Sequence, residues 1–316
     1  GPAAVRAVRV ASRTLGAAAA ESWLAVQARC PGRVYVCGGR DGETDLCSVE
    51  RFDPANVTWE ILPSFSCPRR GASAGILAGK LYICGGRSGT LDLSTVECFN
   101  FSSSAWEQVP SMFTARDGAS GGVAAGKLYV CGGVEGSEPL CSAERFDPTT
   151  LSWELLSPML QRRGFSAAGT VNGLLYVCGG SAVVQRLNSA ECFDPATGAW
   201  RTVAPMIERR EAAAAAAVDQ RLYVCGGGTG TKALSSVERF NPEVGTWDSP
   251  QPMSARRIGS TAAATAGRLF IFGGRDGHGE RCLSLAESFD PASGVWMPLP
   301  PMVERRSRAA AAAALG

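Results

Sequence analysis

Histidine is almost missing from this chain: His278 is the single histidine among 316 residues. Transition-metal redox centres draw on several His, Cys or Tyr ligands that converge on one point. A hydrolytic triad would need a nucleophile beside that one histidine, and nothing near it suggests one. The chain also lacks a glycine-rich phosphate loop followed by lysine. We therefore predict that the protein is not an enzyme and holds no metal or cofactor.

Strong charge and long apolar runs are missing as well. The net charge is only +2, which argues against a broad nucleic-acid footprint. No apolar run reaches the roughly 20 residues that span a bilayer, and no secretory signal is visible. We expect a soluble protein with no nucleic-acid partner and no membrane partner.

What the chain has instead is a repeat. The run Leu81-Tyr82-Ile83-Cys84-Gly85-Gly86 has a close copy in Val34-Tyr35-Val36-Cys37-Gly38-Gly39, 47 residues earlier. Further glycine pairs keep this spacing and end at Gly133, Gly180, Gly227 and Gly274. Six tryptophans recur at the same interval: Trp59, Trp106, Trp153, Trp200, Trp247 and, after 49 residues, Trp296. A fixed period of this size indicates a repeat architecture.

One repeat unit reads as four short strands, over residues 72–78, 81–84, 95–99 and 105–109, separated by turn residues. This spacing is an all-β pattern. The first strand consists mainly of Ala, Gly and Ser, which suits the crowded axis of a ring. The second strand is apolar on both faces, as expected for a sheet packed between neighbouring sheets. We predict a six-bladed β-propeller whose blades are four-stranded antiparallel sheets.

The two ends of the chain indicate how this ring closes. Residues 309–315 resemble the first strand of a seventh unit, whereas Pro31-Gly32-Arg33-Val34 starts a unit at its second strand. We therefore predict that the C-terminal strand completes the first blade and that residues 31–316 form the propeller. Residues 1–30 are predicted to be an N-terminal extension, in which Gly1-Pro2 resembles the remnant of a cleaved tag and the rest favours helix.

Five of the twelve cysteines occupy one repeat position, just before the glycine pair: Cys37, Cys84, Cys131, Cys178 and Cys225. The sixth repeat has Phe272 there, so the position is one of packing. Equivalent positions around a ring lie too far apart to form disulfides. We expect reduced core thiols and a cytoplasmic protein.

Several motifs together resemble kelch repeats: the glycine pairs, the run Val49-Glu50-Arg51-Phe52-Asp53-Pro54 with its copies, the spaced tryptophans, and the Pro-Met phrase that closes each unit. The spacing, with double arginines after Pro-Met, resembles the propellers of the BTB-kelch family. The resemblance covers residues 31–316. One departure from it is Asn100-Phe101, which replaces Asp-Pro in the second repeat.

This resemblance implies a substrate-recognition propeller of a cullin-RING ubiquitin ligase, acting in the ubiquitin-like conjugation pathway. The partner would be a protein substrate or peptide degron, and the cullin scaffold would be reached only through a BTB domain, which this chain does not contain. An actin-binding or cytoskeletal scaffold is the alternative. A propeller enzyme with a copper site is a weaker third reading.

Binding is expected on one face of the ring. Because strand direction alternates within a blade, the loops between second and third strands emerge together with the connections between blades. These loops differ in every repeat, and variable loops on a rigid scaffold usually carry recognition. Arg40, Arg87 and Arg275 follow the glycine pairs directly and should lie at the channel mouth.

Double arginines add charge to this face: Arg69-Arg70, Arg162-Arg163, Arg209-Arg210, Arg256-Arg257 and Arg305-Arg306, with Arg116-Asp117 as the exception. We predict that the first arginine of each pair is structural. Its partners would be the repeat-equivalent glutamates Glu50, Glu97, Glu144, Glu191, Glu238 and Glu287. The second arginine has no matched partner, and Asp117 can replace it, so we assign it to the surface.

The resulting hypothesis is a mixed but net basic rim that binds an acidic or phosphorylated peptide through Arg–carboxylate forks. Its predicted residues are Arg40, Asp41, Arg70, Arg87, Asp117, Glu135, Arg163, Arg186, Arg210, Arg257, Arg275, His278 and Arg306. An ordinary solvated loop face is the competing interpretation.

Overall fold

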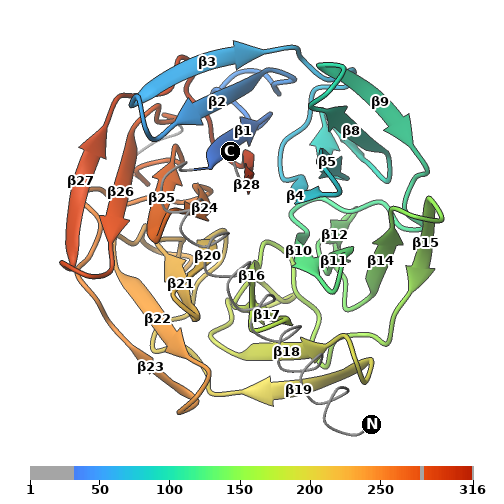
Figure 1. Cartoon of the computed structure of the whole chain (residues 1–316). Helices are drawn as coiled ribbons and strands as arrows, with labels where there is room; N and C mark the ends of the chain where they lie inside the picture. Colours follow the sequence, from blue (N-terminus) through green and yellow to red (C-terminus); the bar gives the residue numbers. More distant parts are fainter. Residues whose placement is uncertain (1–31, 278–280, 315–316) are drawn as a thin grey trace, which may run out of the picture.

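The computed structural model describes residues 32–277 and 281–314 and folds them into six four-stranded antiparallel sheets around a central axis (Figure 1). The predicted all-β, six-bladed propeller is confirmed. The predicted extension over residues 1–30, with its helix, lies outside the described residues, as does His278. The described residues contain no helix long and apolar enough to cross a membrane.

Within each blade the strands are ordered outward from the axis. The innermost strands are β28 (Ala310–Ala314), β4 (Ser73–Leu77), β10 (Ser120–Ala124), β16 (Ala167–Val171), β20 (Ala214–Val218) and β24 (Thr261–Thr265). The second strands are β1 (Arg33–Cys37), β5 (Lys80–Cys84), β11 (Lys127–Cys131), β17 (Leu174–Cys178), β21 (Arg221–Cys225) and β25 (Arg268–Phe272).

The third strands are β2 (Val49–Asp53), β8 (Val96–Asn100), β14 (Ala143–Asp147), β18 (Ala190–Asp194), β22 (Val237–Asn241) and β26 (Ala286–Asp290). The outer strands are β3 (Thr58–Leu62), β9 (Ala105–Val109), β15 (Ser152–Leu155), β19 (Ala199–Val203), β23 (Thr246–Asp248) and β27 (Val295–Leu299). Two loops also carry small hairpins, β6 (Arg87–Ser88) with β7 (Leu91–Asp92) and β12 (Val134–Glu135) with β13 (Glu138–Pro139). The sequence predicts only loops there, because two-residue strands show no periodicity.

The ring closes as predicted. Strand β28 pairs antiparallel with β1, with Ala313 opposite Val34 and Ala311 opposite Val36. In Figure 1 the red β28 lies beside the blue β1 next to the axis. The first and last strands of the propeller therefore share one sheet, so opening the ring at this blade requires the loss of that pairing.

Residue size explains the radial order of the strands. The innermost strand β20 reads Ala-Ala-Ala-Ala-Val, and such small side chains let six strands approach one axis. The second strand β21 has four consecutive buried residues, because both of its faces contact neighbouring sheets. The described cysteines are all free, and the five at the ends of second strands are buried. Burial raises the pKa of the Cys37 thiol to about 12, which makes it a neutral packing group.

Aromatic side chains connect adjacent blades. The ring of Tyr82 packs on Phe146 of the next blade, with centroids 5.5 Å apart, and Phe146 packs on Trp153. Trp153 Nε1 donates a hydrogen bond of 2.8 Å to the carbonyl oxygen of Pro110 in the preceding blade. The other five periodic tryptophans make the equivalent bond. The tryptophan period is therefore a series of links between blades.

Candidate functional site

Six arginines, one for each blade, are buried beneath the face that carries the variable loops. They are Arg69, Arg116, Arg163, Arg210, Arg257 and Arg306, and each has at most 1% of its surface exposed. Each forms an ion pair of 2.8–3.0 Å with the repeat-equivalent glutamate of its own blade. The prediction that one arginine of each pair binds the repeat-equivalent glutamate is confirmed, but it is the predicted first arginine only in Arg69-Arg70 and Arg116-Asp117.

Arg116 shows what these pairs do. Its guanidinium donates to the carbonyl oxygens of Gly132 and Ser142, at 2.7 and 3.0 Å, and to the carboxylate of Glu144. Its own carbonyl oxygen accepts a hydrogen bond from the N–H of Gly86 in the preceding blade, at 2.8 Å. Each buried arginine therefore joins two blades and fixes the base of a variable loop.

The assignment of the second arginine of each pair to the surface is wrong for Arg163, Arg210, Arg257 and Arg306. The position of an arginine within the 47-residue repeat decides whether it is buried, and its order within the pair does not. Arg163 follows Arg116 by 47 residues and Arg69 by two such periods. Only in Arg69-Arg70 is the second arginine the less buried one, with 15% of its side chain exposed. In the other pairs the exposed arginine is the first: Arg162, Arg209, Arg256 and Arg305.

Two residues beyond each buried arginine the chain reaches the axis and forms a closed ring of hydrogen bonds. The residues are Gly71, Gly118, Phe165, Ala212, Gly259 and Arg308, and each N–H donates to the carbonyl oxygen of the equivalent residue in the preceding blade, at 2.7–2.9 Å. All six have φ between 48° and 68°, a region that glycine occupies without strain. The three that carry side chains are each destabilised there by about 1–2 kcal/mol.

Two of these strained side chains meet over the axis. The guanidinium carbon of Arg308 lies 4.5 Å from the centroid of the Phe165 ring, a cation–π geometry. Phe165 precedes β16 and Arg308 precedes β28, and Figure 1 shows these two strands on opposite sides of the channel. Burial lowers the pKa of Arg308, and the charge of Asp117 partly opposes this effect.

Asp117 is buried, with 2% of its surface exposed, which corrects its predicted place on the surface. Its backbone pairs with Val134 at the base of the β12–β13 hairpin, so this position lies beneath a loop. Burial raises the pKa of its carboxyl to about 6, although Arg308 and Arg70 favour the charged form. Its Oδ1 atom is buried without a hydrogen-bond partner among the described residues.

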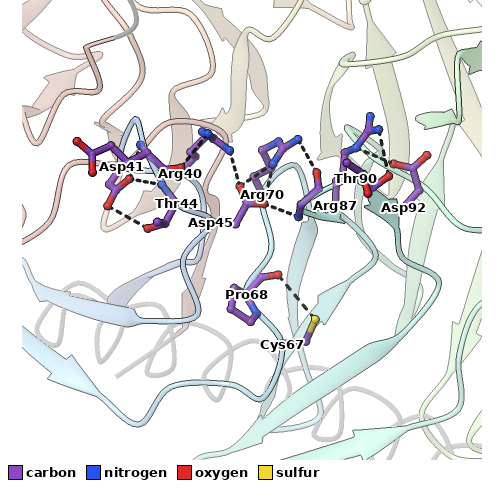
Figure 2. A network of polar contacts seen from close by, with 12 residues as sticks. Arg40, Asp41, Thr44, Asp45, Cys67, Pro68, Arg70, Arg87, Thr90 and Asp92 are labelled. Atoms are coloured by element: carbon purple, nitrogen blue, oxygen red, sulfur yellow. Dashed lines mark hydrogen bonds and ion pairs between the residues drawn. The ribbon is translucent and has the colours of Figure 1, made fainter.

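On one side of the mouth, Asp45 neutralises two of the predicted rim arginines. Its two carboxylate oxygens accept hydrogen bonds from Nη1 of Arg70, each at 2.6 Å, and it lies 3.5 Å from Nη1 of Arg40 (Figure 2). The same carboxylate accepts a hydrogen bond from the N–H of Gly89 in the next blade, at 2.8 Å. Asp45 therefore ties two neighbouring loops together.

Asp92 repeats this arrangement one blade further on. It lies 3.5 Å from Nε of Arg87 and accepts a hydrogen bond of 2.7 Å from the N–H of Gly136. The equivalent positions of the other repeats are occupied by Pro139, Arg186, Ala233 and Cys282. We call the side formed by Arg40, Asp45, Arg70, Arg87 and Asp92 the paired arc. The side formed by residues 181–186, 228–233, Ile258, Arg275 and Arg308 is the open arc.

The open arc encloses a hollow of about 550 Å³. Val134, Phe165 and Ile258 contribute apolar walls. Its charged lining consists of Arg186, Lys232, Glu211, Arg275 and Arg308. Glu211 is already paired with Arg186, at 2.7 Å. The hollow therefore combines an apolar surface with an excess of positive charge.

A second hollow of about 200 Å³ is lined by Arg40, Arg70, Arg275 and Arg308. Arg275 and Arg308 line both hollows. Neither has an ion pair within 4 Å among the described residues, whereas Arg40 and Arg70 share Asp45. Arg275 and Arg308 are therefore the two cations at the mouth that are best placed to take an anion.

Two other predicted rim residues, Asp41 and Glu135, line neither hollow. Asp41 accepts hydrogen bonds from the N–H groups of Glu43 and Thr44, which lowers its pKa, so it holds its own loop. Glu135 is exposed in β12. His278 lies outside the described residues.

Sequence reasoning missed Phe165, Ile258 and Arg308. A signal for two of them was available, because aligning the repeats on the buried arginine gives Gly, Gly, Phe, Ala, Gly and Arg two positions later. Chemically, the arrangement offers anion binding beside an apolar surface. Among residues 32–277 and 281–314, no group of three or more His, Cys, Asp or Glu residues is placed to hold a metal ion.

Comparison with known proteins agrees with this architecture. The sequence matches the KLHDC2/KLHL20/DRC7 Kelch-repeats domain over residues 25–209 and 157–315. No curated protein matches it. The solved structure of YjhT is similar with a TM-score of 0.72 and 17% sequence identity, covering 83% of this chain and 96% of that one. At this identity the likeness concerns the fold alone.

Proposed function

Because the chain belongs to the kelch-repeat family, whose propellers are generally protein-interaction modules, we propose that it is the substrate-recognition propeller of a cullin-RING ubiquitin ligase adaptor. In this role it performs no reaction. It holds a protein substrate through an acidic or phosphorylated segment, and the cullin is reached through a BTB domain outside this sequence. The free, buried thiols suit a cytoplasmic protein.

The observation that carries the binding proposal is the pair Arg275 and Arg308. Both guanidinium groups line the mouth without an ion pair among the described residues. A carboxylate or phosphate that replaces water between two such groups forms charge-assisted, bidentate hydrogen bonds. Positive charge at a concave mouth also steers acidic partners toward it.

An affinity capture with three chains tests this function: wild type, Arg275→Ala, and the control Arg201→Ala on the outer strand β19. Proteins that bind should depend on Arg275, tolerate the control, and map to an acidic segment when truncated. Their turnover should slow when the full-length protein is depleted, and a cullin should co-purify with that protein. Capture that ignores Arg275 would overturn the site. Unchanged turnover together with co-sedimentation on actin filaments would favour the cytoskeletal scaffold.

A further inference from the structure

Each of the two unpaired arginines stands beside an apolar side chain. The backbone of Arg275 is joined to that of Ile258 by two hydrogen bonds of 2.8 and 2.9 Å, which places these residues side by side in the blade formed by β24, β25, β26 and β27. The guanidinium of Arg308 lies over the ring of Phe165. All four residues line the larger hollow. One cavity therefore presents both positive charge and apolar surface.

None of these apolar residues belongs to the repeat. The positions equivalent to Ile258 hold Arg70, Asp117, Gly164, Glu211 and Ser307. The positions equivalent to Phe165 hold Gly71, Gly118, Ala212, Gly259 and Arg308. Isoleucine at the channel mouth is therefore particular to one blade, and it lines the larger hollow.

Backbone strain gives a second, independent observation. Phe165 has φ of 52° and Arg308 has φ of 55°, whereas three equivalent positions use glycine at φ of 62–67°. Side chains at such positions are destabilising, and backbone strain of this kind clusters at functional sites. Both strained side chains point into the same hollow, so the strain and the cavity lead to one conclusion.

The paired arc cannot form the same kind of site. Arg40 and Arg70 are bound to Asp45, and Arg87 lies beside Asp92. An incoming anion would have to displace a carboxylate that also ties adjacent loops together. In the open arc no described carboxylate forms an ion pair with Arg275 or Arg308: Glu211 is paired with Arg186, and the buried Asp117 acts on Arg308 only from beyond 4 Å.

We propose, resting on the function proposed above, that the open arc binds a two-part motif in an extended acidic segment of a partner protein. An oxyanion is held between Arg275 and Arg308, and a neighbouring apolar side chain enters the larger hollow against Ile258 and Phe165. The anion sets the register of the segment, and the apolar side chain selects among acidic segments. The oxyanion is a side-chain carboxylate or a phosphate, since both suit arginine forks.

Selection from a displayed library of random heptapeptides on the immobilised chain tests this proposal. We expect enrichment of peptides that carry Asp or Glu within two positions of Leu, Ile, Val, Phe or Met. The consensus peptide is then synthesised with an amidated C-terminus, and its affinity is measured by fluorescence polarisation. Replacing its acidic residue by the amide should weaken binding by about tenfold or more, as should replacing its apolar residue by Ser.

Arg308→Gly is the sharpest variant, because it restores the repeat's own glycine and removes strain, so folding is not expected to suffer. This substitution should weaken binding of the consensus peptide by about tenfold or more. It should have little effect on binding of the amide version, which already lacks the anion. Ala212→Gly relieves the same strain at the same ring and is the matched control. Ile258→Ser should weaken binding of the consensus peptide, which carries the apolar residue, and should leave binding of the version with Ser at that position unchanged.

A phosphoserine version and a version with a free C-terminus distinguish the sources of the oxyanion. Tighter binding of the phosphoserine peptide would support the site and identify phosphate as its anion. If acidic peptides are enriched without a neighbouring apolar residue and bind Ile258→Ser normally, the two-part motif is wrong while the acidic-segment function stands. Both proposals fail if no acidic peptide is enriched. They also fail if the consensus peptide and its amide version each bind Arg308→Gly as tightly as they bind the wild type.

Discussion

The six buried arginines and the arginines at the channel mouth are chemically identical, yet they have different roles. Each buried arginine recurs in every repeat, has a glutamate of its own, and binds the same set of backbone carbonyl groups. The mouth arginines recur irregularly, and each has a different environment. Arg70 is bound by Asp45, Arg308 lies on Phe165, and Arg275 has no ion pair within the described residues.

The difference shows how to distinguish scaffold from recognition in a repeat protein. A side chain that keeps the period meets the same neighbours in every blade, so its role is to hold the ring. A side chain that breaks the period meets a neighbourhood found in one blade only. Departures such as Ile258 and Arg308 are therefore the better guide to binding, and strain at the axis strengthens that reading.

The largest expected effect comes from breaking the ring itself. Deleting residues 309–316 removes β28 and leaves the edge of β1 unpaired. We expect loss of cooperative thermal unfolding. The free energy lost with this strand is comparable with the whole free energy of unfolding of a domain, which is about 5–15 kcal/mol. Replacing the exposed Val183 and Val184 by Gly is the control and should leave the melting curve in place. A truncated chain that melts like wild type would contradict the closure.

Arg116→Ala against Arg275→Ala tests the comparison directly. Removing Arg116 leaves Glu144 buried without its partner, which should lower the free energy of unfolding by about 3–5 kcal/mol. Removing Arg275 should change it by less than about 0.5 kcal/mol, because it has no ion pair to lose among the described residues. Urea unfolding measures both. Equal losses would show that the mouth arginine is also part of the scaffold.

Asp117→Asn probes the boundary between the two regions. In the folded protein the pKa of Asp117 is about 6, above its ordinary value of 3.8, so the folded state binds a proton more tightly. Its contribution to stability therefore falls as pH rises from about 4 to 6 and stays low above that window. Asn should remove this dependence and stabilise the protein by up to about 3 kcal/mol at pH 8, measured by unfolding across that range. Equal pH profiles for both proteins would refute the raised pKa.

The smallest expected change in stability is a gain at the axis. Arg308→Gly and Ala212→Gly each remove the strain of a side chain at a left-handed backbone conformation. Each should stabilise the chain by about 0.5–1 kcal/mol, after allowing for the flexibility of glycine in the unfolded chain. Only Arg308→Gly should lose peptide binding. Thermal melts measure the first effect and fluorescence polarisation the second. Lower stability in Arg308→Gly would mean that its contact with Phe165 holds the ring.

Most of the architecture was readable in the sequence, because a repeated unit meets repeated neighbours. The glycine pairs, the tryptophans and the small innermost strands predicted the blades, and residues 309–315 predicted the closure of the first one. The pairing of six arginines with six glutamates was readable too. Which arginine of each pair does this was not predicted correctly, although the phase of the repeat contains that answer.

The amino-acid sequence by itself determined the number of blades, their order and their links, since these follow from local patterning repeated at a constant interval. Only the tertiary structure decided which charges remain available at the mouth. Asp45 reaches Arg70 from another loop, and Phe165 reaches Arg308 across the axis. Such contacts depend on where the closed ring places residues that lie far apart in the chain, and no spacing along the chain encodes that geometry.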